Sequence, residues 1–494
     1  MNKIPLIFPI TFFLFLLSLT SNAFAKTPIT NCTVISEPGE YYLVNDIIDF
    51  STSICIDIQA NNVIFDCQGH TIDGTGSSSS LGIQIYRSDS ITTNITIKNC
   101  VLTDWGSAIY LYNSNSNTLT NITANSNRYN GLWLYNSNSN TLTNITANSN
   151  IFGLSIVSSN SNTLTNITAN SNSIGLSFDS SNSNTLTNII VDSNNYGLYL
   201  YDSDSNTLTN ITANSNSDYG LYLYYSDSNT LTNITANYNN GGIDIEGALN
   251  ITLTNIIVEK NLNDGGILIS TTSYITATNI ITNFNNGYGI YLEFKSVGNG
   301  TLTNLTANYN DIGIDIEEAL DITLTNIIAN NNNRDGILIG ALYITATNIT
   351  TNFNGERGIY LESVINGTLT NLTANYNDIG IEIFSVTSTT FTNITTNFNN
   401  LGIYLYESYS TTLTNIIADS NNYGLYLREL SSSIIKNSIF KNNTYGIYFS
   451  LISENNVSNI IADSNNYGLY LFYSSLNTIK NSIIKNNTYG IYLH

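Results

Sequence analysis

Residues 131–150 read GLWLYNSNSNTLTNITANSN, and variants of this unit fill most of the 494-residue chain. Leu132 and Leu134 alternate with aromatic residues, which is the period-two pattern of a strand with one buried face. A polar turn follows, and apolar residues then alternate with polar ones on both sides of Asn144. The unit therefore predicts three short strands per coil, joined by bends rich in Asn and Ser.

The unit recurs with a regular period. Elements of the type Gly-[Ile/Leu]-x-[Ile/Leu] begin nineteen units from Gly82 to Gly490, spaced 22 to 26 residues apart, with Ala108 as the one replacement for glycine. A strand of three to five residues cannot bury its apolar face alone, so each coil must stack on the next at about 4.8 Å. We therefore expect an all-β, single-stranded parallel β-helix of about 19 to 20 coils.

Asparagine marks the bend between the second and third strands in eighteen coils, from Asn99 to Asn481. Asn tolerates left-handed backbone geometry best after Gly, and stacked amides can bond from coil to coil. We expect an asparagine ladder along the molecule. A leucine-rich repeat of similar period and an Asn-rich aggregation-prone tract are the two rival interpretations. The Gly-led strands have β and turn residues where a leucine-rich repeat would have helical segments, which disfavours that repeat. The fixed register of the glycines disfavours an aggregation-prone tract.

Composition excludes several classes of protein. Lys and Arg total 14 against 35 Asp and Glu, giving a formal charge of -21, so a phosphate backbone would be repelled and nucleic acid is excluded as a partner. Only 10% of residues are charged, where about 25% is usual for globular domains, and this disfavours ordinary helical architecture. With 42% hydrophobic residues, the chain is too apolar for ordinary disorder.

The first 25 residues have the pattern of a secretory signal peptide. Lys3 precedes an apolar stretch from Ile4 to Leu19, and Ala23-Phe24-Ala25 fits the small-x-small cleavage rule, so Lys26 is the expected mature N-terminus. An uncleaved membrane anchor is the alternative. No later segment has the composition to cross a bilayer. We expect an extracellular or cell-surface protein without a transmembrane segment after signal removal.

Four cysteines lie in the first fifth of the chain. In an exported protein an even count indicates disulfides, and three pairings are possible. We favour Cys32 with Cys55 and Cys67 with Cys100, because Phe65-Asp66-Cys67 and Lys98-Asn99-Cys100 occupy similar places in successive units. Buried free thiols are the alternative.

The leading segment carries a family resemblance. Cys32–Ile35, Pro38–Leu43 and Val63–Gly74 are similar to the N-terminal capping coil of right-handed parallel β-helix proteins with pectin-lyase-like topology. With the repeats, the chain resembles the NosD-like, carbohydrate-binding and sugar-hydrolase type of surface protein. The resemblance implies a right-handed helix, with a cap and first coil at 26–74 and repeats at 75–494. It is specific for fold, since this architecture hosts lyases, hydrolases, adhesins and passive surface proteins.

No metal or cofactor site is expected. Copper, which the NosD label implies, binds to Cys, Met or imidazole ligands. This chain has one Met, in the signal peptide, and two histidines, His70 in the cap and His494 at the last position.

Acidic residues cluster in the central coils. Glu293 and Glu317 occupy the same outward position on adjacent coils, and Asp315 lies two residues before Glu317. Backbones about 4.8 Å apart would suit the carboxyl pair of a retaining glycosidase. No basic residue occupies the equivalent outward positions of those coils, which disfavours an anionic sugar. A solvated acidic face without catalysis is the favoured interpretation, so the protein is expected not to be an enzyme.

Outward aromatic residues give the strongest indication of a binding surface. The second and fourth residues after the Gly or Ala are aromatic in many coils, and should stand on one exposed sheet. Rows of amphipathic rings suit sugars or a partner surface, although Tyr also stabilises sheets by itself. The predicted binding residues are Tyr110, Tyr112, Trp133, Tyr135, Tyr199, Tyr201, Tyr222 and Tyr224.

These observations predict a secreted or cell-surface structural or adhesive element that binds glycans or neighbouring surface-layer proteins. The alternative is a polysaccharide-degrading hydrolase or lyase that uses Glu293, Asp315 and Glu317. The chain ends partway through a coil, at Tyr492-Leu493-His494, without an amphipathic cap. We therefore expect either that the natural protein continues or that it associates end to end.

Overall fold

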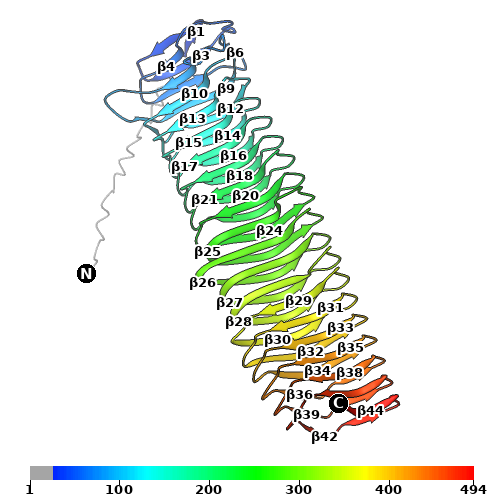
Figure 1. Cartoon of the computed structure of the whole chain (residues 1–494). Coiled ribbons are helices and arrows are strands. Elements are labelled where there is room, and N and C mark those ends of the chain that lie inside the picture. The colour runs from blue at the N-terminus through cyan, green and yellow to red at the C-terminus, as the bar shows by residue number, and fades with distance from the viewer. Residues whose placement is uncertain (1–25) are drawn as a thin grey trace, which may run out of the picture.

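A computed structural model describes residues 26–494, and the predicted signal peptide lies outside the described residues. Residues 26–494 form a straight column of about 21 stacked coils that contains strands and no helix (Figure 1). Neighbouring coils pair in parallel along the whole column. This confirms the predicted right-handed, all-β parallel β-helix.

The N-terminal end of the column contains the shortest and most irregular strands. Two of them, β8 and β11 (Ser114–Asn115), pair only with each other. The strands of this end are β1 (Thr27–Ile29), β2 (Thr33–Ile35), β3 (Gly39–Leu43), β4 (Ile54–Ile58), β5 (Val63–Asp66), β6 (Thr71–Asp73), β7 (Leu81–Ile85), β8 (Thr92–Thr93) and β9 (Ile95–Thr103).

One side of the column, here called the Gly row, is built from the Gly-led elements. Its strands stack in register, with each glycine on the glycine of the next coil. They are β10 (Ser107–Tyr112), β13 (Asn130–Tyr135), β15 (Phe152–Val157), β17 (Ile174–Asp179), β19 (Tyr196–Tyr201), β21 (Tyr219–Tyr224), β23 (Gly241–Glu246), β29 (Arg357–Glu362), β31 (Ile379–Phe384), β33 (Leu401–Tyr406), β35 (Tyr423–Arg428), β38 (Tyr445–Ser450), β41 (Tyr467–Phe472) and β44 (Tyr489–Leu493).

The opposite side, here called the Thr row, carries the Thr-x-Thr-Asn sequences. Its strands are β12 (Thr118–Asn125), β14 (Thr141–Thr146), β16 (Thr163–Thr168), β18 (Thr185–Ile190), β20 (Thr207–Thr212), β22 (Thr230–Thr235), β24 (Ile251–Glu259), β30 (Asn366–Thr373), β32 (Thr389–Asn397), β34 (Thr412–Asp419), β36 (Ile434–Lys436), β37 (Ile439–Lys441), β39 (Asn456–Ser458), β40 (Ile461–Asp463), β42 (Thr478–Lys480) and β43 (Ile483–Lys485).

The number of separate strands per coil differs from the prediction. The expected second and third strands are continuous in most coils, as in β14, which runs through Asn144. They are separate near the C-terminal end, as in β36 and β37. In four central coils the two rows merge into single strands, β25 (Gly265–Asn283), β26 (Tyr288–Thr306), β27 (Ile312–Ile328) and β28 (Ile337–Thr350). The reason is that a bend in a solenoid keeps its hydrogen bonds to the coils on either side, so the ladder is not interrupted.

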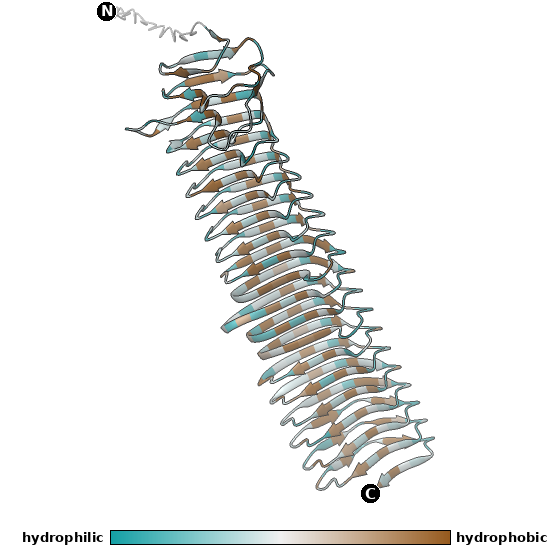
Figure 2. Cartoon of the chain, turned by 45° about the horizontal axis from the view of Figure 1, so that its top comes forward, coloured by the Kyte–Doolittle hydropathy of each residue, from teal (hydrophilic) through white to brown (hydrophobic). Residues whose placement is uncertain are grey.

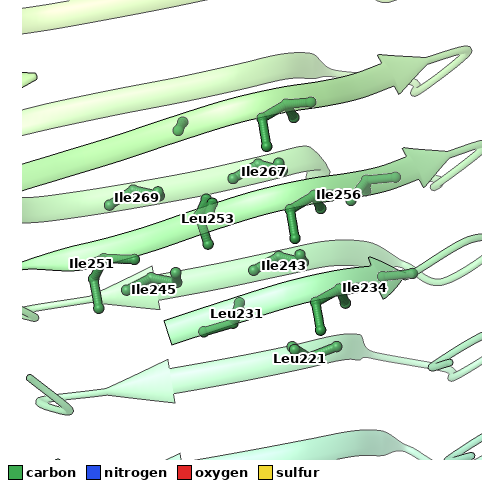
Figure 3. Close-up of a cluster of buried hydrophobic side chains, with 14 of the residues drawn as sticks. Leu221, Leu231, Ile234, Ile243, Ile245, Ile251, Leu253, Ile256, Ile267 and Ile269 are labelled. Carbon is green, nitrogen blue, oxygen red and sulfur yellow. The ribbon is translucent and has the colours of Figure 1, made fainter. Parts of the chain in front are cut away.

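Inward side chains from the two rows meet along the axis. Figure 2 shows apolar and polar residues alternating along the strands, and Figure 3 shows Leu221 and Ile243 of the Gly row with Leu231 and Ile234 of the Thr row between the two layers. All four are at most 1% exposed. Burying one such side chain contributes about 1.5 to 3 kcal/mol, so a continuous aliphatic interior holds the coils together.

The predicted asparagine ladder is present at the bend of the Thr row. All eighteen residues from Asn99 to Asn481 have φ between 51° and 59°. From Asn121 to Asn415 each Nδ2 donates to the Oδ1 of the asparagine one coil earlier, for example Asn233 to Asn210 at 3.0 Å and Asn348 to Asn326 at 2.8 Å. The asparagine side chains at the bend are therefore hydrogen-bonded to one another from coil to coil, in addition to the backbone pairing.

A second, buried asparagine ladder stands at the corner before the Gly row. Asn239 is typical: its Oδ1 accepts from the backbone N–H and Nδ2 of Asn216 at 2.8 and 3.0 Å, and its Nδ2 donates to the Ala213 carbonyl at 3.0 Å. The same amides explain the glycines. A Cβ on Gly380 would lie 2.5 Å from the Gly402 carbonyl oxygen and 2.9 Å from Nδ2 of Asn399. The Gly row is thus glycine-led because of close coil packing.

Two disulfides lock the first coils. Cys32 is bonded to Cys55 and Cys67 to Cys100, which is the favoured pairing, and no cysteine of residues 26–494 is free. Within this described part of the chain, no helix has the length and apolar character needed to cross a membrane.

The two asparagine ladders predict different losses of folding stability when an asparagine is replaced. Asn239→Ala leaves a buried backbone N–H and a buried carbonyl without partners, so we expect the free energy of unfolding to fall by about 3 kcal/mol. Asn233→Gly keeps the left-handed bend but loses exposed amide bonds, so we expect a loss of about 1 kcal/mol. Urea unfolding followed by circular dichroism measures both, and equal losses would contradict a structural difference between the ladders.

Candidate functional site

The eight predicted binding aromatics all lie on the outer side of the Gly row, but in two clusters. In the first, Tyr110 and Tyr112 of β10 lie against Trp133 and Tyr135 of β13, with ring centroids 4.4 and 5.5 Å apart. In the second, Tyr199 stacks on Tyr222 at 5.5 Å and Tyr201 on Tyr224 at 5.8 Å. They share one sheet, and two coils without outward aromatics separate the two clusters.

The two intervening coils carry short outward side chains. By register, Ser155 and Val157 of β15 follow Trp133 and Tyr135, and Ser177 and Asp179 of β17 precede Tyr199 and Tyr201. Trp133 is covered on one side by Tyr110, and Tyr199 on the other side by Tyr222. Their opposite ring faces are therefore directed toward this two-coil stretch, here called the serine stretch. The strands of Trp133 and Tyr199 are three coils apart, roughly 14 Å.

The residue immediately before the Gly also points outward, which the sequence analysis missed. Tyr196 packs against Tyr199 at 6.0 Å, and Tyr219 against Tyr222 at 5.4 Å. Strict alternation would not have revealed this position, because it lies three residues before the first outward aromatic. Near the C-terminal end the same position forms an unbroken ring ladder of Tyr423, Tyr445, Tyr467 and Tyr489, with centroids 4.7 to 5.0 Å apart.

A hollow of about 320 Å³ opens where the Gly row lacks tall side chains. In β28 the outward positions are Leu338 and Gly340, and β27 and β29 rise on either side. The carboxylates that line it are Asp315, Glu317 and Glu318 from β27 and Glu362 from β29. Glu317 and Glu362 are two coils apart, roughly 9.5 Å between backbones. Glu362 was not among the predicted site residues.

The predicted acidic residues occupy the positions that the stacking of successive coils implies. Glu293 pairs directly with Glu317 on the next coil, and Asp315 follows Tyr291 in the same way. The Tyr291 hydroxyl donates to Glu317 at 3.1 Å, and the Tyr360 hydroxyl donates to Glu362 at 3.2 Å. The carboxylates of the hollow are thus held by neighbouring phenols.

Asp315 is the most buried of these acids, with 6% of its surface exposed. Burial, with the charges of Glu317 and Asp335 nearby, raises the pKa of Asp315 to about 6. A carboxyl that holds its proton near neutral pH can donate it, whereas its ionised neighbours can only accept.

A basic residue also reaches this region, and the sequence analysis missed it. Arg357 occupies the position before Gly358, and its guanidinium bonds to Asp335 at 2.8 and 3.3 Å. Its Nη1 lies 3.5 Å from Glu382. The guanidinium also lies 4.5 Å from the centroid of the Tyr360 ring. Two carboxylates therefore compensate the charge of Arg357, and the hollow stays acidic.

Comparisons with known families agree with this architecture. Residues 81–228 and 175–317 match the family described as right handed beta helix region, and residues 342–494 match the family described as periplasmic copper-binding protein (NosD). The protein is a right-handed β-helix protein, and its residues 342–494 are NosD-like. A search of curated proteins found no match.

Solved structures similar to this chain match it at low identity and low TM-score. The N-terminal fragment of gene product 12 from bacteriophage Phi29 is 12% identical, with 90% of this chain and 87% of that chain covered and a TM-score of 0.41. A mutant of the periplasmic alginate epimerase AlgG is also 12% identical, covering 58% and 77%, with a TM-score of 0.36. The PL6 family alginate lyase AlyGC is 10% identical, covering 95% and 100%, with a TM-score of 0.27. At these scores the likenesses carry no argument about activity.

The residues of this NosD-like protein do not fit a copper site. Copper requires clustered imidazole, thiolate or thioether ligands. Between residues 342 and 494, His494 is the one side chain of those types. His70 lies in the cap and bonds to Asp46 at 3.0 Å, and the four cysteines are used in disulfides. Residues 26–494 hold no cluster of three His, Cys, Asp or Glu side chains arranged for a metal.

The raised pKa of Asp315 predicts a pH-dependent stability. Between pH 4 and 6 the folded protein keeps this proton while the unfolded chain has lost it, so stability falls as pH rises through that window. Asp315→Asn removes the cost of the buried charge, and we expect the variant to be more stable than wild type by about 2 kcal/mol at pH 8. Below pH 4 the two should unfold alike.

Urea unfolding at pH 3.5 and pH 8 measures this difference. Asp244 provides an independent replicate, because burial and the charge of Glu246 raise its pKa to about 6 as well. Asp244→Asn should therefore change stability in the same direction. A variant less stable than wild type at pH 8 would contradict the assignment.

Proposed function

We propose that this protein is an exported, rigid surface element that binds neutral glycan chains at the serine stretch between its two aromatic clusters. The observation that carries the proposal is that uncovered ring faces of Trp133 and Tyr199 are directed toward the same two coils. A short glycan chain lying along this stretch would have one aromatic face at each end.

The chemistry of the serine stretch suits sugars. Indole and phenol rings offer flat apolar area at small entropic cost, since each has only two side-chain torsions. Ser155, Ser177 and Asp179 supply hydroxyl and carboxylate groups for sugar hydroxyls. The formal charge of -21 favours a neutral glycan over a uronate-rich one.

The scaffold supports such a role, because the strands that present the rings are paired on both sides. Packed coils leave little freedom at the binding surface, so little ordering free energy is lost when a ligand binds. The signal-like residues 1–25 and the two disulfides favour an oxidising location outside the cytoplasm.

Single aromatic substitutions test the glycan site. We expect Trp133→Ala and Tyr199→Ala each to weaken glycan binding roughly tenfold, because each removes one open ring face. Tyr426→Ala is the matched control, since this ring lies far from the serine stretch on the Gly row, 4.9 Å from both Tyr404 and Tyr448. A glycan array identifies the ligand, and calorimetry measures the affinities.

The outcomes of this experiment separate the two kinds of partner. Equal loss in Tyr426→Ala would indicate a general effect of the sheet and contradict the site. Binding to envelope proteins without binding to any glycan would replace the proposal with a protein partner.

A second function, polysaccharide cleavage, is favoured by the hollow around Gly340. Asp315 has a pKa of about 6, and Glu362 lies across the hollow on a strand two coils away, roughly 9.5 Å between backbones, which leaves room for the water of an inverting hydrolase. In that mechanism Asp315 would protonate the leaving oxygen, and a carboxylate opposite would activate water. The adjacent pair Glu293 and Glu317 would instead suit a retaining mechanism.

A hydrolysis screen on neutral polysaccharides tests the second function. If the hollow is catalytic, Asp315→Asn and Glu317→Gln should each lower turnover by at least about a hundredfold. Glu407→Gln, an exposed acid outside the hollow, is the control. Turnover that is absent in the wild type, or equal in all variants, would rule out cleavage here.

A further inference from the structure

The outer side of the Thr row is a regular array of threonines. Fourteen successive coils, from β12 to β34 and including the merged strands β25 to β28, carry the sequence Thr-x-Thr at the same register. Thr118 begins one column and Thr120 the other, and they end at Thr412 and Thr414. All of these side chains are half-exposed or exposed.

Threonine is kept in this array while its surroundings vary. The inward residue between the two threonines is Leu208 in β20, Ala277 in β25 and Phe391 in β32. The outward positions of the Gly row change freely among Tyr, Ser, Asp, Glu, Leu and Gly. Strand propensity alone would admit Val, Ile or Tyr on the Thr row as well.

The array is also uncharged. In the described strands β12 to β34, neither column contains an acidic or basic side chain. The array is bounded by lysines, since Thr120 pairs with Lys98 in the coil before and Thr414 with Lys436 in the coil after. Protein interfaces depend on aromatic and Arg anchors, and sugar sites on aromatic faces, and the two columns offer neither.

The spacing of the array is set by the backbone. Hydroxyl and methyl groups repeat at about 4.8 Å from coil to coil and roughly 6.6 Å along each strand, over a length of about 60 Å. Oxygen positions in hexagonal ice repeat along the a axis at an interval close to the coil spacing, and along the c axis at an interval somewhat longer than the spacing of the two columns. The adjoining asparagine ladder, with Nδ2 to Oδ1 distances near 3.0 Å, keeps the coils in register.

We propose that the threonine array binds ice. Each methyl group orders the water around it and each hydroxyl can donate to and accept from that water. A preorganised two-dimensional array fixes many waters at once, and each costs at most about 2 kcal/mol to immobilise. A crystal of ice presents water molecules in a lattice of this kind. An ice plane that binds the array would stop growing where the protein covers it. This activity is separate from the glycan site, which lies on the Gly row.

Substitution at the centre of the array tests the proposal. The mature chain, residues 26–494, is expected to show thermal hysteresis, to inhibit ice recrystallisation and to partition into growing ice. The double variant Thr209→Tyr and Thr232→Tyr should reduce the hysteresis by about half or more. The two tyrosine rings project further than threonine and would keep the ice surface out of contact with the neighbouring threonines.

The matched control places the same side chains on the same coils. Thr212 and Thr235 lie beyond the asparagine bend, at a position where β18 and β24 carry Ile190 and Ile257, so bulky residues fit there. The double variant Thr212→Tyr and Thr235→Tyr should keep full activity on ice. Circular dichroism and melting temperature confirm that both variants are folded.

Three results would overturn the proposal. The first is a wild-type protein without effect on ice. The second is equal loss of hysteresis in the two double variants. The third is binding to microcrystalline cellulose or chitin through Thr209 and Thr232 without binding to ice, which would make the array a site for crystalline polysaccharide.

Discussion

The whole molecule depends on the parallel pairing of each coil with the next. A six-residue strand such as β14 has one apolar face, and it can bury that face only against a layer that its neighbours complete. Pairing fixes the register, register aligns the inward Leu and Ile side chains, and their burial stabilises the pairing in turn. Every surface property follows from the same register, because an outward residue in one coil stands directly on its equivalent in the next.

Much of the fold follows from local chemistry and was predictable from the sequence. Alternation around Leu132 and Leu134 defines a half-buried strand, and Asn144 defines a left-handed bend. Both disulfides follow from equivalent places in successive units. Strand number was harder to predict, because whether β14 continues through Asn144 depends on hydrogen bonds to neighbouring coils. The reason for the glycines was also hidden, since the carbonyl and amide that exclude a Cβ at Gly380 come from other coils.

The candidate sites were predictable only in part, because they arise from differences between neighbouring coils. The carboxylates Glu293 and Glu317 were placed correctly, since they share one position of the repeat. The hollow beside them depends on the small outward residue Gly340, and the ion pair of Arg357 with Asp335 depends on a position that alternation alone leaves ambiguous. The break between the aromatic clusters, in contrast, was already implied by Ser155 and Ser177 in the repeat.

The near identity of some coils has a genetic consequence. Residues 113–127 and 136–150 have the same fifteen-residue sequence, NSNSNTLTNITANSN, at the same place in consecutive coils. Misaligned recombination between such segments of a gene would insert or delete one whole coil. Each coil contacts only its two neighbours. In a shortened or lengthened product, every coil would therefore still pair with the coils on either side. A product with one coil more or one coil fewer would therefore keep the same cross-section and differ only in length.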